Sequence, residues 1–193
     1  ERHVLPWWLV LGPTGHGKSA LLTAAPRCAE IEPGDAGEPR FFLAPTGAFI
    51  ELPAGEPPPA LLRALRRLRP RQPLSGAFVV LRADHLADAL APIRAQLDRL
   101  TAALALQLPV VLTLSQLDRL AGFAELTLDL TSRTSVLGAT IPPRAGPDSL
   151  QVAVRQRLTA DDGALAWVRQ RCHALVARAR TDDERSALLH GFW

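Results

Sequence analysis

The residues with the clearest chemical meaning lie near the start of the chain, in the stretch Gly12-Pro13-Thr14-Gly15-His16-Gly17-Lys18-Ser19. Their types and spacing fit GxxxxGK[ST], a pattern in which glycines let backbone amides turn towards a phosphate. Lys18 would pair with the β- and γ-oxygens, and the Ser19 hydroxyl would hold Mg²⁺. We therefore predict that these eight residues bind a nucleotide, ATP or GTP, and that Ser19 is the metal ligand.

Lysine usage supports this prediction. The chain contains 22 lysine and arginine residues, and Lys18 is its only lysine. An ammonium group is a compact charge that can reach between phosphates, whereas a guanidinium group is a wide planar fork. His16 could touch a phosphate, although the interpretation we favour is that it fills a variable position of the loop.

The segments around the glycines are those required to present them. Residues 7–11, WWLVL, form an apolar run of the kind found in parallel strands that are covered on both faces. Residues 18–25 are good helix formers. A strand, a glycine loop and a helix are therefore expected in this order.

The remainder of the chain alternates between strand and helix patterns. We expect a hairpin of 40–44 with 48–52, buried strands at 77–81, 109–114 and 136–141, and helices at 60–68, 84–106, 148–180 and 182–191. This alternation predicts an α/β fold of the P-loop NTPase type, similar to small GTPases, with a mainly parallel sheet flanked by helices. The expected domains are a nucleotide-binding domain, residues 1–147, and a helical C-terminal extension, residues 148–193.

Composition limits the other possibilities. The 193 residues carry a net charge of +3 and are 48% hydrophobic, but no apolar run has the roughly 18 residues of a membrane helix. The basic stretch 63–71 is interpreted as the solvated face of a helix whose leucines 62, 65 and 68 point inward, so no nucleic-acid partner is expected. The chain starts at Glu1 and lacks methionine, so we expect it to be an excised piece of a longer protein.

Several segments together resemble one family. In order they are LPWWLVLGPTGHGKSALL, FFLAPTGAFIELPAG, RPRQPLSGAFVVL, LPVVLTLSQLDRLAGF, SVLGATIP and ERSALLHGF. This series is similar to the NTPase domain of the IcmF/TssM proteins of type VI secretion. The resemblance implies a domain on the cytoplasmic face of the bacterial inner membrane that is not itself membrane-spanning. It also implies TssL and baseplate proteins as partners.

The chain departs from the family where the metal is held. The family has an Asp-Thr-Ala-Gly motif whose aspartate reaches Mg²⁺ through water, whereas this chain reads Glu51-Leu52-Pro53-Ala54-Gly55. A gapless alignment puts Leu52 at the aspartate position, with Glu51 on the opposite face of the strand. An alignment shifted by one residue makes Glu51 a candidate catalytic or metal-side carboxylate. The stretch 27–40, where the family has a Mg²⁺-binding threonine, contains none.

The base-recognition motif is also altered. The family pattern Thr/Asn-Lys-x-Asp is Ser115-Gln116-Leu117-Asp118 in this chain. Asp118 could accept two hydrogen bonds from a guanine edge, or it could be the N-cap of a helix. Gln116 replaces a lysine whose ammonium normally reaches back to the phosphate loop. Asp118 is therefore predicted to bind nucleotide, with the choice between ATP and GTP left open.

Three functions compete on this pattern. The first is a nucleotide-binding domain of a type VI secretion membrane complex with weak or absent hydrolysis. The second is an active NTPase that drives a conformational change of that complex. The third is a structural assembly module with an empty loop. A signalling GTPase-like protein without a role in secretion is a weaker fourth possibility.

Overall fold

The computed structural model describes residues 5–32, 37–53, 55–120 and 123, and also residues 152, 170, 173, 174 and 177, which are helical. The chain forms two compact units, Glu1–Leu117 and Asp118–Trp193, and the elements below belong to the first unit up to the end of β6. Three predictions fall outside these residues: the strand 136–141, most of the two C-terminal helices, and the boundary between 147 and 148. Within the described part, no helix is both long and apolar enough to cross a membrane.

The first unit is built on a six-stranded sheet with the order β2-β3-β4-β1-β5-β6. Its strands are β1 Trp7–Leu11, β2 Ala29–Glu32, β3 Arg40–Ala44, β4 Gly47–Glu51, β5 Gly76–Arg82 and β6 Val110–Ser115. Its helices are α1 Lys18–Ala24, α2 Pro59–Leu68 and α3 Leu86–Leu104, and short 3-10 turns follow β5 (Ala83–His85) and β6 (Leu117–Arg119). The strands β4, β1, β5 and β6 are parallel, and β2, β3 and β4 pair antiparallel. The predicted α/β fold with a mainly parallel sheet is confirmed, as is the hairpin.

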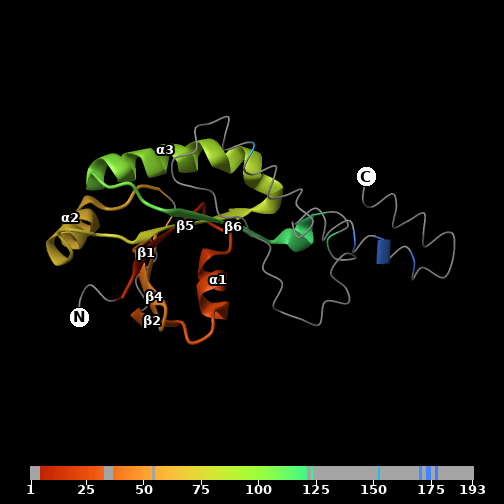
Figure 1. Ribbon diagram of the computed structural model, residues 1–193, viewed down its shortest axis with the longest axis horizontal. Coiled ribbons are helices and arrows are strands. Elements are labelled where there is room, and N and C mark those ends of the chain that lie inside the picture. The colour runs from red at the N-terminus through yellow and green to blue at the C-terminus, as the bar shows by residue number, and fades with distance from the viewer. Residues whose placement is uncertain are drawn as a thin grey trace. The chain divides into compact units, whose positions relative to one another are not determined.

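Side-chain alternation along the strands divides the core into two layers. Leu9, Leu11, Ile50 and Leu52 belong to the layer that packs against α2 and α3. Val10 belongs to the other layer, which also contains Leu22 of α1. Figure 1 shows the same arrangement, with α2 and α3 along one face of the sheet and α1 on the opposite face. Because successive strand residues point to opposite faces, this division fixes which side chains can reach α1.

The burial predicted for the strand 109–114 is wrong. Its residues form β6 beside β5, but 48% of Val110, 53% of Leu112 and 40% of Leu114 are exposed. The reason is position: among the described strands β6 is the outermost one on its side, and α3 packs against its neighbour β5. An apolar run alone does not distinguish an edge strand from a central one.

The basic stretch on α2 is also arranged differently from the prediction. Leu65 is buried and Arg66 is exposed, as expected, but Leu68 is 48% exposed. Arg69 takes the inward position instead and lies with its guanidinium over the Trp7 ring, at 5.3 Å from its centroid. A long arginine stem next to an aromatic ring can fill a position that the helical period assigns to leucine.

Candidate functional site

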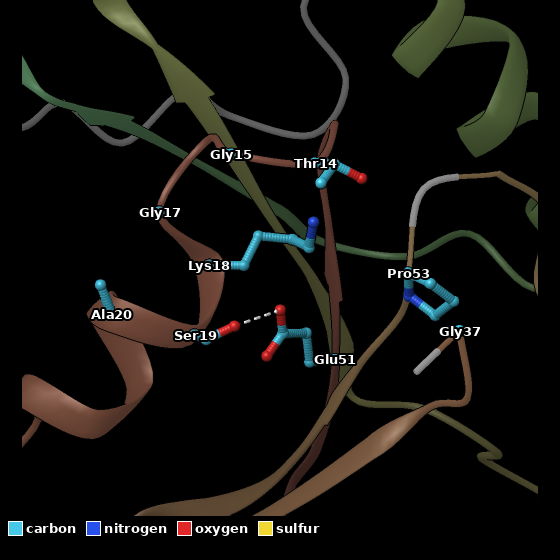
Figure 2. Close-up of a pocket in the computed structure, with 9 residues that line it drawn as sticks. All are labelled: Thr14, Gly15, Gly17, Lys18, Ser19, Ala20, Gly37, Glu51 and Pro53. Atoms are coloured by element: carbon cyan, nitrogen blue, oxygen red, sulfur yellow. Dashed lines mark hydrogen bonds between the residues drawn. The ribbon is translucent and has the colours of Figure 1, made fainter. Parts of the chain in front are cut away.

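The candidate site lies at the carboxyl edge of the four parallel strands. The phosphate-loop residues follow β1 directly, Glu51 ends β4, Arg82 ends β5 and Ser115 ends β6. Since parallel strands all end at the same edge of a sheet, four segments far apart in the sequence meet here. A cleft of about 480 Å³ opens at this edge, and its lining is drawn in Figure 2.

Two glycines are required by the shape of the loop. Gly12 has a φ of 146°, and a Cβ placed on it would lie 2.3 Å from the carbonyl oxygen of Val80 on β5. Gly17 has a φ of 83° and precedes the first residue of α1. Both positions need a residue without a side chain, the first for space and the second for backbone conformation. The glycine pattern is therefore explained by geometry as well as by ligand chemistry.

Lys18 is held at the centre of the loop. Its Nζ donates to the carbonyl oxygens of Gly12 at 2.8 Å and Pro13 at 3.1 Å. The residue is only 6% exposed, and burial lowers the pKa of its ammonium while the charge of Glu51 raises it. Because an ammonium has three donors, one remains for a ligand in the cleft.

Ser19 is paired with Glu51. The Ser19 hydroxyl donates to Glu51 Oε1 at 2.8 Å, the hydrogen bond drawn as a dashed line in Figure 2. The gapless alignment puts Leu52 at the carboxylate position, but Leu52 is 1% exposed and packs in the α2–α3 layer. The two residues do point to opposite faces, but Glu51 is opposite Val10 in the register of β4 with β1, so it is the one on the α1 side. This geometry favours the shifted alignment, in which Glu51 is the candidate metal-side carboxylate.

The side chains at this point fit a magnesium ion. The Ser19 hydroxyl donates its hydrogen bond to Glu51, which leaves the lone pairs of its oxygen available to a cation. Glu51 Oε2 is buried and has no hydrogen-bond partner among the described residues, so it can accept from a metal-bound water. Mg²⁺ binds oxygen ligands and keeps several waters, and it is commonly completed by phosphate oxygens. Phosphate and water ligands are needed here, because the described residues contain no group of three or more His, Cys, Asp or Glu side chains that could hold a metal.

The ends of β5 and β6 tie the phosphate loop to the sheet. Ser115 Oγ donates to the His16 carbonyl at 2.6 Å, with the Leu81 carbonyl at 3.2 Å, and Gln116 Nε2 donates to the Gly15 carbonyl at 2.8 Å. Gln116 thus reaches the loop with an amide where the resemblance implies an ammonium. Ser115 was not predicted as a site residue, although its place at the end of an apolar strand and at the first position of the base-recognition motif is a usable signal.

His16 turns away from the cleft. It is 8% exposed, and its Nδ1 accepts a hydrogen bond from the backbone N–H of Arg82 at 3.0 Å. Burial lowers the pKa of His16, and the nearby charges of Arg82, His85 and Lys18 lower it further, against a smaller opposing effect of Asp84. A neutral ring is required for Nδ1 to accept. This geometry gives His16 a structural role in holding the loop against β5.

The other predicted residues are distributed around the cleft. Thr14, Gly15, Gly17, Lys18 and Ser19 line it together with Glu51 and Pro53, and the lining adds two residues that the sequence did not single out, Ala20 and Gly37. Asp118 is exposed and is the second residue of the 3-10 turn after β6, where the second unit begins. It therefore does not stand at the N-cap position of that turn, and its role towards a base stays a prediction.

Comparison with solved structures gives low similarity. One match is a GDP complex of an ADP-ribosylation-factor-like GTP-binding protein, the small COPII coat GTPase SAR1 of Encephalitozoon cuniculi, at 17% identity and a TM-score of 0.43, covering 64% of this chain and 56% of that one. Another is SsGBP in complex with GDP, at 17% identity and a TM-score of 0.31, covering 67% of this chain and 40% of that one. The chain thus spans about half the length of these proteins. No curated protein matches it.

Comparison with family models gives an assignment. The match covers residues 59–192, from the start of α2 onward, and includes Ser115, Gln116 and Asp118. It does not include the phosphate loop, whose interpretation therefore depends on residues 12–19 and their contacts. Since the matched segment is more than half of the sequence, the chain belongs to the family of the IcmF-related N-terminal domain.

Proposed function

We propose that this chain is a nucleotide-binding domain that holds a nucleoside di- or triphosphate with Mg²⁺ at the edge of its sheet. The observation that carries this proposal is the convergence of Lys18, Ser19 and Glu51 on one cleft. Lys18 provides a buried cation with a donor to spare, and the Ser19–Glu51 pair provides oxygen atoms for a metal. The bound Mg²⁺ would neutralise phosphate charge. The protein's own contribution is to orient these groups before the ligand arrives.

Family membership supports a setting for this domain. Because the chain belongs to the family of the IcmF-related N-terminal domain, we infer that it is part of the membrane complex of type VI secretion. The domain would then lie on the cytoplasmic face of the bacterial inner membrane. TssL and baseplate proteins are the partners that the sequence resemblance implies. In that setting, nucleotide occupancy would act by stabilising one conformation of the domain.

We propose that the chain hydrolyses its nucleotide slowly or not at all. Phosphoryl transfer needs a positioned water and well-held metal in addition to a grip on phosphate. The stretch 27–40 has no threonine to complete the metal shell. The segment after β4 is fixed at two points, because the Leu52 N–H donates to the Val10 carbonyl and Gln96 donates to the Gly55 carbonyl.

Active hydrolysis is the second candidate, and the position of Glu51 is the observation that favours it. The sequence alone left the carboxylate of the metal site in doubt, and the hydrogen bond from Ser19 supports Glu51 in that role. A chain that keeps this carboxylate retains one of the parts that catalysis requires.

Nucleotide-dependent melting tests the proposal. GDP, GTP, ADP and ATP are each added with Mg²⁺, and a nucleotide at 100 times its Kd should stabilise the chain by about 2.7 kcal/mol. Lys18→Ala should abolish the shift, and Lys18→Arg should fail as well because a guanidinium is too wide for this loop. Thr23→Ala is the control, since the Thr23 hydroxyl is exposed and donates to carbonyls of its own helix. A folded wild type without any shift at millimolar nucleotide would identify the loop as an empty structural element.

A further inference from the structure

Arg40 connects the metal-side carboxylate to the edge of the sheet. It starts β3 and lies opposite Glu51 in the antiparallel register of β3 with β4. Its Nε and Nη2 donate to the two oxygens of Glu30 on β2, at 2.7 and 2.6 Å. Its remaining nitrogen, Nη1, lies 3.6 Å from Glu51 Oε2. One guanidinium is thus shared between two carboxylates, with the stronger contacts on Glu30.

The Glu51 oxygen that faces Arg40 is the one that lacks a hydrogen bond. Oε1 is committed to Ser19, whereas Oε2 is buried without a hydrogen-bond partner. Among the described residues, Arg40 is therefore the cation that lies within ion-pair distance of the atom that a metal-bound water would use. A divalent cation and a guanidinium favour the same negative charge and repel each other.

We propose that Arg40 is a tethered competitor of Mg²⁺ for Glu51, and that Glu30 sets the strength of this competition by holding two of the three guanidinium nitrogens. Arg40 is a positioning residue in this scheme, because it does not line the cleft and acts through Glu51. The inference depends on the proposed function, since it concerns the metal that accompanies the nucleotide.

Opposite substitutions should have opposite effects. In Arg40→Gln the competing charge is gone, so a lower Mg²⁺ concentration should be needed for nucleotide binding. In Glu30→Gln, Arg40 loses its bidentate partner and pairs more fully with Glu51, so a higher concentration should be needed. Arg40 is 35% exposed, and ion pairs of this kind are worth up to about 1 kcal/mol, so we expect changes of about threefold in each direction.

The experiment measures the affinity of the full chain for GDP and for ADP by calorimetry, across a series of free Mg²⁺ concentrations and in EDTA. In EDTA no Mg²⁺ is bound, so loss of the Arg40 charge can only weaken the binding of the phosphates. A lower Mg²⁺ requirement in Arg40→Gln would therefore have to come from the metal site. Arg40→Lys keeps the charge but not the planar fork that Glu30 holds, so it should not lower the Mg²⁺ requirement as Arg40→Gln does. Arg94→Gln is the matched control, because it breaks a similar pair with Asp98 on the exposed surface of α3.

The outcomes separate the two proposals. A wild type that binds neither nucleotide contradicts the proposed function. If the wild type binds nucleotide in a Mg²⁺-dependent manner, the proposed function stands. If the Mg²⁺ requirement then changes in the same direction in Arg40→Gln and Glu30→Gln, or changes in neither, only the proposal of competition by Arg40 is overturned. An Arg40→Lys that behaves like Arg40→Gln overturns it as well. Should Arg40→Gln fail to fold, as judged by circular dichroism, Glu30→Gln decides by itself, since an unchanged or lower Mg²⁺ requirement contradicts the proposal.

Discussion

Glu51 on β4 lies opposite Val10 on β1, and this register puts its carboxylate on the face of the sheet where Ser19 begins α1. One residue further along, Leu52 points into the core formed with α2 and α3. A shift of one position in a strand exchanges the two faces, so the metal-side group of this site is decided by register.

Substitution of Glu51 should therefore affect Mg²⁺ binding, whereas substitution of Leu52 should affect the stability of the fold. Glu51→Gln keeps the size of the side chain and should raise the Mg²⁺ concentration needed for nucleotide binding, with little loss of stability. Leu52→Asp would bury a carboxylate among apolar side chains and should cost more than the about 2–5 kcal/mol of a Leu→Ala truncation. Chemical denaturation and nucleotide titration check both. If Leu52→Asp bound Mg²⁺ more tightly than the wild type does, position 52 would be the carboxylate position, as in the gapless alignment.

The phosphate loop could be predicted from the sequence because its chemistry is local. The glycines, Lys18 and Ser19 lie within eight residues, and the strand and helix beside them follow from the apolar pattern. The tether from Gln116 to Gly15 joins residues 101 positions apart, and the pair of Arg40 with Glu51 depends on the register of a hairpin. Such long-range contacts leave no periodic signal, and the exposure of β6 is likewise a property of its place in the sheet.

The two glycines Gly12 and Gly15 should tolerate alanine differently. Both have a positive φ, but a Cβ on Gly12 meets the Val80 carbonyl oxygen at 2.3 Å, whereas a Cβ on Gly15 meets nothing within 4 Å. Gly15→Ala should cost about 1–2 kcal/mol from backbone strain alone. Gly12→Ala requires the backbone of β5 to move and should cost at least about 3 kcal/mol. Urea unfolding of both variants measures the difference, and equal costs would contradict the close packing of the loop on β5.

His16 should make the stability of the domain depend on pH. Its folded pKa is lowered from 6.5, so the unfolded chain takes up a proton at a higher pH than the folded chain does. Stability should therefore fall as the pH drops below about 6.5 and level off once the folded ring is also protonated, with a slope of at most about 1.4 kcal/mol per pH unit. His16→Asn retains an acceptor for the Arg82 N–H and should remove this part of the dependence. The free energy of unfolding is measured across this pH range for the wild type and for His16→Asn. If it changes with pH equally in both proteins, His16 does not contribute to the pH dependence.

Asp118 should decide between bases if it contacts one. Guanine offers two donors that a carboxylate can accept, whereas adenine does not present this pair. Asp118→Asn should then weaken the binding of GDP and GTP more than that of ADP and ATP. Calorimetric titration with all four nucleotides tests this, with Arg119→Gln as a neighbouring control. Equal losses for both bases would mean that Asp118 does not read the base.

Turnover of nucleotide by the purified chain should be slow, no faster than about 10⁻³ s⁻¹, which is the scale of a small GTPase without its activator. Glu51 weakens one reason for this expectation, because its hydrogen bond with Ser19 makes it a candidate for the carboxylate that the gapless alignment lacks. Two other reasons stay: no threonine between Arg27 and Arg40 can complete the metal shell, and the segment that follows β4 is fixed to Val10 and Gln96.

Steady-state release of phosphate from GTP and ATP decides the matter. Preorganised charges and a well-placed metal provide most of the stabilisation in phosphoryl transfer, so a site that keeps only the phosphate grip and one carboxylate should gain little. Turnover near 1 s⁻¹ that disappears in Lys18→Ala would establish an active NTPase. Glu51→Gln would then be the first variant to measure, because a loss of turnover with nucleotide binding retained would assign the catalytic metal to the Ser19–Glu51 pair.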